Sequence, residues 1–175
     1  MITLHSVNST DTKALAFIQP LYEQSFPLHE RRNFSDVTEL LLNHLMQMIL
    51  IRNDGIEIGF IVKWKLDSFN FVEHFAIHPS HQGKGLGAAA FKKIMQSSSK
   101  QLVVETELPE NATAIRRIKF YEKCGLTTIP FTYMQPPYHE GDTFFPMQLM
   151  SRFAIDIDQF NAIKTELYQK VYHCF

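Results

Sequence analysis

The heptapeptide HQGKGLG, residues 81–87, decides which fold the sequence predicts. It holds three glycines in five residues, Gly83, Gly85 and Gly87, with an apolar run on each side. Glycine has no Cβ, so successive backbone N–H groups can turn inward, and the start of a helix adds about half a positive charge at the same point. The stretch therefore predicts a phosphate cradle between a strand and a helix.

The composition indicates one domain without a strong charge bias. A chain of 175 residues with 45% apolar content can bury one hydrophobic core but scarcely two. Its formal net charge of -1 lacks the positive field that non-specific nucleic-acid binding needs, so we expect no nucleic-acid partner. No apolar run approaches the ~18 residues of a membrane helix, and no signal-like segment opens the chain, so we expect no membrane association.

Cysteine and histidine usage argues against disulfides and metals. Cys124 and Cys174 form neither a disulfide framework nor a CxxC motif, which favours reduced thiols and a cytoplasmic location. Strand alternation would scatter His74, His78 and His81, so we expect no metal site. The chain shows no repeat and no linker, and we predict a single domain over residues 1–175.

Hydrophobic periodicity predicts an α/β chain in which the first strands form antiparallel hairpins. The hairpin turn is expected at Asn53, Asp54 and Gly55, and the glycine loop directly follows a strand. We predict strands at 2–7, in the hairpin 48–67 and at 69–77, 100–108, 131–135 and 144–150. We predict helices at 9–26, from about 35, at 87–97, at 111–126 and at about 156–175.

A dinucleotide site is the main rival interpretation of the loop. Gly83, Gly85 and Ala88 satisfy the GxGxxA fingerprint, and Glu105 ends the next strand. In that fold, however, the first glycine follows its strand almost at once, whereas five residues separate Ile77 from Gly83 here. An ATP-type P-loop also fails, because the lysine of the loop is not followed by Ser or Thr.

A strand, a proline-marked turn and Gln82-x-x-Gly85-x-Gly87 running into a helix resemble the coenzyme-A loop of the GNAT superfamily of N-acetyltransferases. A second stretch, NATAIRRIKFYEKCGL (111–126), is similar to the family's next signature helix, and the resemblance covers residues 69–126. It implies the GNAT-type fold, a central mixed, mostly antiparallel sheet flanked by helices with a C-terminal helix.

The resemblance also implies that the chain binds acetyl-CoA. The strand before the loop splays from its neighbour in this family, and its unpaired backbone groups hold the pantetheine arm. Lys92, Lys93, Arg116 and Arg117 are candidates for the remaining phosphate of the coenzyme. The expected cofactor-binding residues are Phe75, Ala76, Ile77, Gln82, Gly83, Lys84, Gly85, Leu86, Gly87 and Asn111.

Amine acetylation needs a base, because a primary amine with a pKa near ~10.4 is almost wholly protonated at pH 7. Strand alternation predicts Glu73 on the same face as Phe75 and Ile77, where family members often carry a carboxylate, and Glu73 is the candidate base. Glu105 and Glu107, on one face of the next strand, are the reserve candidates.

Tyr121, in FYEKCG, matches the family tyrosine that can protonate the leaving thiolate, so it is the candidate general acid. The resulting prediction is an N-acetyltransferase that moves the acetyl group of acetyl-CoA to a primary amine by direct attack. A non-catalytic acetyl-CoA sensor or scaffold is the alternative, and a dinucleotide-dependent oxidoreductase is a weaker one.

The acceptor and the oligomeric state stay open in the sequence. Arg31 and Arg32 favour a carboxylate-bearing acceptor, whereas Glu30, Glu140 and Asp142 favour a cationic one. The C-terminal helix could mediate a homodimer, although such a helix more often covers its own sheet. Its apolar stripe consists of Phe160, Ile163, Leu167, Val171 and Cys174.

Overall fold

The computed structural model describes residues 1–42 and 44–173, and their strands form one mixed sheet in the order β1-β2-β3-β4-β5-β8-β6, with β7 paired to β8. The strands are β1 (Ile2–Val7), β2 (Met46–Asn53), β3 (Ile56–Lys65), β4 (Phe69–Ile77), β5 (Gln101–Glu107), β6 (Thr127–Thr128), β7 (Tyr133–Gln135) and β8 (Phe145–Ser151). The α-helices are α1 (Thr12–Ser25), α2 (Phe34–Leu40), α3 (Leu86–Gln96), α4 (Ala112–Lys123) and α5 (Ile157–Lys170), and the short 3-10 turns are η1 (Leu28–Glu30) and η2 (Pro79–His81).

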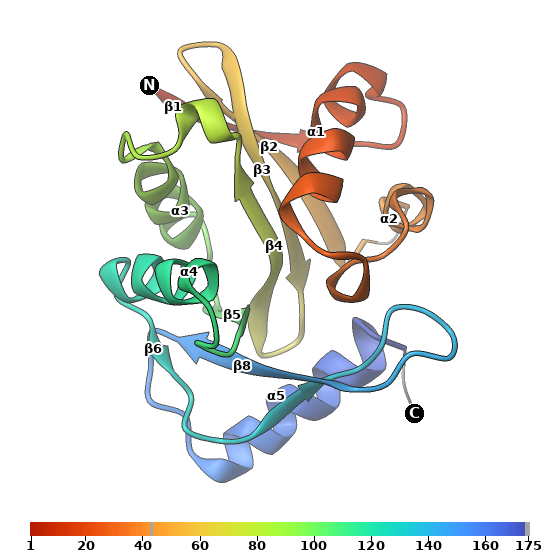
Figure 1. Cartoon of the computed structure of the whole chain (residues 1–175), viewed down its shortest axis with the longest axis vertical. Coiled ribbons are helices and arrows are strands. Elements are labelled where there is room, and N and C mark those ends of the chain that lie inside the picture. Colours follow the sequence, from red (N-terminus) through yellow and green to blue (C-terminus); the bar gives the residue numbers. More distant parts are fainter. Residues whose placement is uncertain (43, 174–175) are drawn as a thin grey trace.

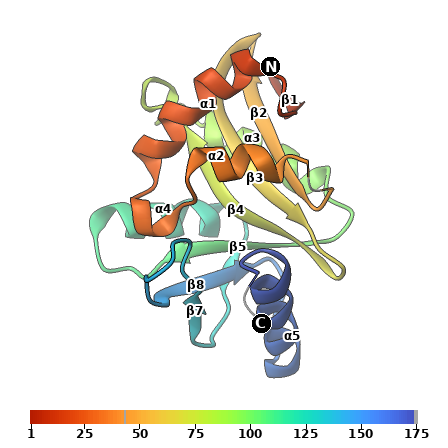
Figure 2. The same cartoon turned by 90° about the vertical axis from the view of Figure 1, so that its right-hand side faces the viewer.

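The helices cover both faces of the sheet (Figures 1 and 2). Helices α3 and α4 pack on one face, with Phe91 and Ile118 in a shared cluster. Helices α1, α2 and α5 contribute to a larger cluster on the other face, around Trp64 and Phe71. The predicted mixed, mostly antiparallel sheet flanked by helices is therefore confirmed. None of the helices in the described part of the chain has the length and apolar character of a membrane span.

Strands β4 and β5 separate halfway along their length. They pair in parallel only between Phe69–Val72 and Gln101–Val104. Beyond that point β4 pairs only with β3, and β5 pairs only with β8. Because the backbone groups of a strand point alternately to its two sides, the second half of β4 presents an open edge towards β5. This separation agrees with the splay that the sequence resemblance implies.

A β-bulge at Glu73 corrects one prediction. Val62 pairs with His74 and Lys63 pairs with Val72, so Glu73 has no partner on β3. The extra residue breaks the alternation, and Glu73 contacts groups on the α1 and α5 side whereas Phe75 packs against α3 and α4. The predicted common face for Glu73 and Phe75 is therefore wrong.

Helix α5 is shorter than the predicted 156–175. It begins after Asp156, whose side chain and that of Gln159 form a capping box, and it ends at Lys170. Its apolar stripe is buried in the protein's own core, so it covers its own sheet. Dimerisation stays a prediction, and Cys174 lies outside the described residues.

Gly59 on β3 marks a close approach of β3 to β4, which suggests a test of the sheet. A Cβ at this position would lie 2.3 Å from the carbonyl oxygen of Ala76, and backbone cannot move aside cheaply. We expect Gly59→Ala to lower the free energy of unfolding by about 2 to 4 kcal/mol in urea denaturation. Gly55→Ala, which meets no atom within 4 Å but has a φ of 82°, should cost only about 1 kcal/mol. Equal costs would contradict the close approach.

Candidate active site

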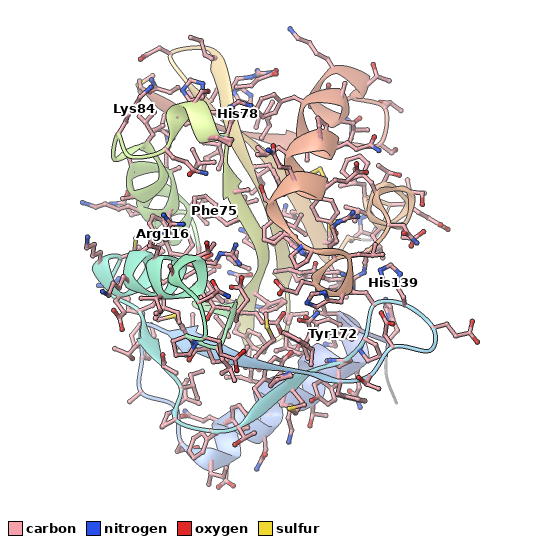
Figure 3. All side chains as sticks on the ribbon, in the orientation of Figure 1. Phe75, His78, Lys84, Arg116, His139 and Tyr172 are labelled. Carbon is pink, nitrogen blue, oxygen red and sulfur yellow. The ribbon has the colours of Figure 1, made fainter. Side chains whose placement is uncertain are left out.

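The glycine loop forms an open cradle at the start of α3. Gly83 and Gly85 both have a φ of 74°, and a Cβ at either position would meet nothing within 4 Å. Gly85 is the N-cap of α3, so the unpaired N–H groups of the first helical turn lie next to this open space. Figure 3 shows Lys84 at the tip of the same loop. This geometry fits an anionic group such as a pyrophosphate.

The loop is attached to the open end of β4. The Gln82 side chain donates a 2.7 Å hydrogen bond to the carbonyl of Ile77, and Lys84 donates one of 2.7 Å to the carbonyl of Ser80. The ring of Phe75 stacks on Phe120 of α4 with 5.7 Å between the ring centroids (Figure 3). The cradle and the open edge of β4 are thus held in one continuous segment.

Several of the predicted coenzyme ligands have hydrogen-bond or ion-pair partners within the protein. Asn111 is the N-cap of α4, and its side-chain oxygen accepts hydrogen bonds from the N–H groups of Thr113 and Ala114. Lys93 donates to the carbonyl of Ile2. Arg117 forms an ion pair with Glu107, and Arg116 donates a hydrogen bond to the Thr113 hydroxyl.

Glu73 is buried and fully engaged. Its carboxylate pairs with Arg32, accepts a 2.7 Å hydrogen bond from Trp64 Nε1 and accepts another of 2.8 Å from the hydroxyl of Tyr138. Burial by itself would raise the pKa of Glu73, but Arg32 and the hydrogen bonds outweigh it and lower that pKa. Glu73 is therefore an ionised carboxylate with little tendency to take up a proton.

Glu105 lies directly after Val104, the last residue of β5 that pairs with β4, and its protonation differs from that of Glu73. The hydroxyl of Tyr172 donates to its two oxygens at 2.8 and 3.0 Å. Burial, together with the nearby charges of Glu73 and Glu30, raises the pKa of Glu105 to about 8. Two carboxyl groups with pKa values pushed apart are a common arrangement in acid–base catalysis.

Tyr121 lies in the core between α4 and α3, where its ring packs edge-on against Phe91 at 5.2 Å. Burial raises the pKa of its hydroxyl above the ordinary value. The phenol therefore keeps its proton at neutral pH, which a general acid requires.

Two hollows flank this part of the sheet. One, of about 380 Å³, lies between the end of α1, the end of β5 and the start of α4. It contains Glu30. Burial and the nearby charge of Glu107 raise the pKa of Glu30 to about 7. The other, of about 560 Å³, lies between α2 and the C-terminal end, and Arg32, Tyr138 and Tyr172 line it.

The sequence analysis missed the roles of Tyr172 and Trp64. Tyr172 follows the last helix, 67 residues from Glu105, and no local motif relates the two residues. Tyr138 lies close to Glu140 and Asp142 in the loop QPPYHEGD (135–142), two acidic residues that favour a cationic acceptor in the sequence prediction.

Of the three histidines near the loop, His74 packs against Tyr22 of α1, whereas the rings of His78 and His81 are neighbours with 6.2 Å between their centroids. The Nε2 of His74 bonds to the carbonyl of Glu30, and burial lowers the pKa of His74 to about 4, so the ring is neutral. His78 contacts Ser80 in η2 instead. Within residues 1–42 and 44–173, no group of His, Cys, Asp or Glu has an arrangement that could hold a metal ion.

Comparison with known proteins identifies the family that the chain resembles. Residues 45–127 match the acetyltransferase (GNAT) domain. A solved structure from Bacteroides thetaiotaomicron, whose name assigns it to the GNAT acetyltransferases, is 32% identical over 99% of both chains, with a TM-score of 0.92. No curated protein matches the chain.

Two more distant structures share the fold. A variant of a spermidine N-acetyltransferase from Vibrio cholerae is 15% identical over 85% of this chain and 93% of that one, with a TM-score of 0.64. A GNAT acetyltransferase from Elizabethkingia anophelis, solved with acetyl-CoA bound, is 16% identical over 86% of this chain and 96% of that one, with a TM-score of 0.56.

The raised pKa of Glu105 should be visible in the stability of the protein. The folded chain keeps this proton up to about pH 8, whereas the unfolded chain releases it near the ordinary pKa of 4.5. The contribution of protonated Glu105 is therefore complete below pH 4.5 and is lost as the pH rises to 8. We expect the free energy of unfolding of the wild type, minus that of Glu105→Gln, to fall by about 3 kcal/mol between pH 5 and pH 8. Taking this difference removes the contributions of Glu30 and His74, which both proteins contain. A difference that does not change with pH would contradict the raised pKa of Glu105.

Proposed function

The chain belongs to the GNAT family of acetyltransferases, and on this premise we propose that it transfers the acetyl group of acetyl-CoA to a primary amine. The observation that carries the proposal is the open edge of β4 leading into the glycine cradle of α3. An extended pantetheine arm can pair with such an edge like an added strand, while the pyrophosphate occupies the cradle.

The residues proposed to hold acetyl-CoA lie in the continuous segment 75–87. Phe75, Ala76 and Ile77 offer their backbone groups to the pantetheine, and the loop of residues 82–87 offers N–H groups to the pyrophosphate. When bound, acetyl-CoA supplies the activated acetyl thioester. The Asn111 side chain contributes to α4 as its cap, so we propose no direct contact between Asn111 and the coenzyme.

The contacts favour Glu105 over Glu73 as the base. Glu73 is bonded to Arg32, Trp64 and Tyr138, whereas Glu105 has the higher pKa and lies where β4 and β5 separate. In the proposed reaction Glu105 takes one proton from the acceptor ammonium, and the free amine nitrogen then bonds to the acetyl carbon. The carbon–sulfur bond then breaks, and Tyr121 protonates the sulfur.

The acceptor is proposed to be a cationic amine without a carboxylate next to it. Arg32 is paired with Glu73, and Arg31 donates to the carbonyl of Phe26, so both arginines are already engaged. The hollow of about 380 Å³ contains three carboxyl groups, those of Glu30, Glu107 and Glu110, against the single guanidinium of Arg117. This excess of negative charge supports a positively charged acceptor.

Acetyl-CoA at a hundred times its Kd should stabilise the protein against unfolding by about 2.7 kcal/mol. Gly85→Asp should abolish this effect, because it places a carboxylate in the open space where the pyrophosphate must lie. Gly55→Asp is the matched control, since Gly55 also has a positive φ and an open environment but lies in the β2–β3 turn. Thermal unfolding with and without acetyl-CoA measures both. A folded Gly85→Asp protein that acetyl-CoA still stabilises would refute the cradle.

Release of free coenzyme A across a panel of diamines, amino acids and peptides tests the activity and separates an enzyme from a sensor. With an acceptor found, Glu105→Gln should lower kcat by about 10²- to 10⁴-fold at pH 8, and the loss should shrink as the pH nears the pKa of the amine. Tyr121→Phe should lower kcat at every pH, because the leaving thiolate then has no general acid to protonate it.

The same panel tests Glu73, the candidate base of the sequence prediction. Glu73→Gln leaves the buried guanidinium of Arg32 unpaired, so its main expected effect is a loss of about 3 to 5 kcal/mol in stability. If Glu73→Gln folds normally and loses turnover while Glu105→Gln stays active, then Glu73 is the base.

A further inference from the structure

A chain of hydrogen bonds joins the two carboxylates across the end of the molecule. Tyr172 donates to Glu105 at 2.8 Å, the hydroxyls of Tyr172 and Tyr138 lie 3.3 Å apart, and Tyr138 donates to Glu73 at 2.8 Å. The rings of Tyr138 and Tyr172 are also close, with 5.3 Å between their centroids. This chain comes from four different elements, so tertiary packing alone creates it.

The chain connects a buried group to a hollow at the surface. Glu105 is only 9% exposed, whereas Tyr138 and Tyr172 line the hollow of about 560 Å³ together with the exposed His173. Arg32 holds this arrangement in place: its guanidinium lies 4.6 Å from the centroid of the Tyr138 ring and donates to the carbonyl of Val171. Arg32 thereby holds Val171, the residue before Tyr172, which Figure 3 labels.

Resting on the proposed function, we propose that Tyr172 and Tyr138 form a proton relay that carries the proton taken up by Glu105 to the hollow between α2 and the C-terminal end. Tyr172 acts through Glu105 and is a positioning residue. Burial raises the pKa of both phenols well above the ordinary value. The charge of Glu105 adds to this effect at Tyr172, and that of Glu73 adds to it at Tyr138. Neither phenol therefore accumulates as an anion, and each must pass one proton on as it receives another.

The proton balance of the reaction requires such an exit. An ammonium nitrogen loses two protons in becoming an amide N–H. Glu105 takes the first proton before the attack, and this proton leaves the protein. Tyr121 gives its proton to the coenzyme sulfur and is reprotonated by the second nitrogen proton, which the tetrahedral adduct releases. In the resting structure Tyr172 donates to Glu105, and Tyr138 donates to Glu73 and towards Tyr172, so the relay requires both hydroxyls to turn. Glu105 then gives its proton to the oxygen of Tyr172, Tyr172 gives its own to Tyr138, and Tyr138 releases one to solvent in the hollow. No further reactant is needed.

The groups that face Glu105 determine how the relay responds to pH. They are Tyr172 from the C-terminal end, Tyr133 from β7, Glu73 from β4 and Glu30 from η1. The hydrogen bond from Tyr172 is one of the contacts that lower the pKa of Glu105 against the effect of burial. Removing that hydroxyl should therefore raise the pKa of Glu105 as well as interrupt the relay.

The test compares Tyr172→Phe with Tyr168→Phe in the full chain, using an acceptor from the coenzyme-release panel. Tyr168 is the matched control, because it lies in the last turn of α5, shortly before Tyr172, and its hydroxyl donates to the carbonyl of Met134, outside the relay. In Tyr172→Phe we expect kcat at pH 8 to fall about 10-fold, its pH midpoint to move upward and the KM for acetyl-CoA to stay unchanged. Tyr168→Phe should keep the wild-type midpoint even if it is less stable.

A small base gives a second measurement that a structural role would not change. Imidazole can enter the hollow and accept the proton directly, so kcat of Tyr172→Phe should rise with imidazole concentration while that of the wild type and Tyr168→Phe should not. If the wild type is active and Tyr172→Phe changes neither the pH midpoint nor the response to imidazole, the relay is wrong and the proposed function stands. A wild type that acetylates nothing in the panel would overturn the proposed function and the relay with it.

Discussion

The buried ion pair between Arg32 and Glu73 holds together the elements that surround the cleft. Arg32 precedes α2, Glu73 is the bulged residue of β4, and the same guanidinium also donates to the carbonyl of Val171 after α5. A buried pair adds little net stability over apolar packing, but loss of one partner leaves an uncompensated charge and costs about 3 to 5 kcal/mol. Glu73 continues the alternation of Phe69 and Phe71, which face the α1 and α5 side, and the bulge shifts the residues after it, so that Phe75 faces α3 and α4. The buried pair thus links the segment before α2, the sheet and the residues that directly follow α5.

The separation of β4 from β5 begins next to the bulge at Glu73. An open strand edge is a liability that proteins usually cover, and this edge is flanked by aromatic packing of Phe75 against Phe91 and Phe120 on the α3 and α4 side. The parallel pairing ends at Val72, one residue before the bulge. Backbone groups that would have completed a ladder are then available to an extended ligand, next to a helix start that suits its phosphates. The proposed coenzyme-binding surface therefore depends on missing sheet pairing as much as on particular side chains.

The sequence predicted what depends on local pattern. The glycine loop, the strand of residues 69–77 and the helix starting after Asn111 carry turn, period and capping signals that act within a few residues, and the structure has each of them. The face of Glu73 was mispredicted because a bulge has no clear signature in the alternation of FNFVEHFAI. The contact between Tyr172 and Glu105 joins residues 67 positions apart and depends on the placement of α5, which no local pattern encodes. Roles that require tertiary packing were therefore beyond the sequence alone.

The two carboxylates at the fork of the sheet show how packing assigns different chemistry to the same side chain. Glu73 and Glu105 are both buried, and burial alone would raise the pKa of each. Glu73 has a guanidinium, an indole N–H and a phenol as partners, whereas Glu105 has no cation among the groups that shift its pKa. The charge on Glu73 also raises the pKa of Glu105, so the first carboxylate, by staying ionised, helps the second to hold a proton. A change at Arg32 would consequently alter the protonation of Glu105 without touching it, which makes the ion pair part of the chemistry as well as of the fold.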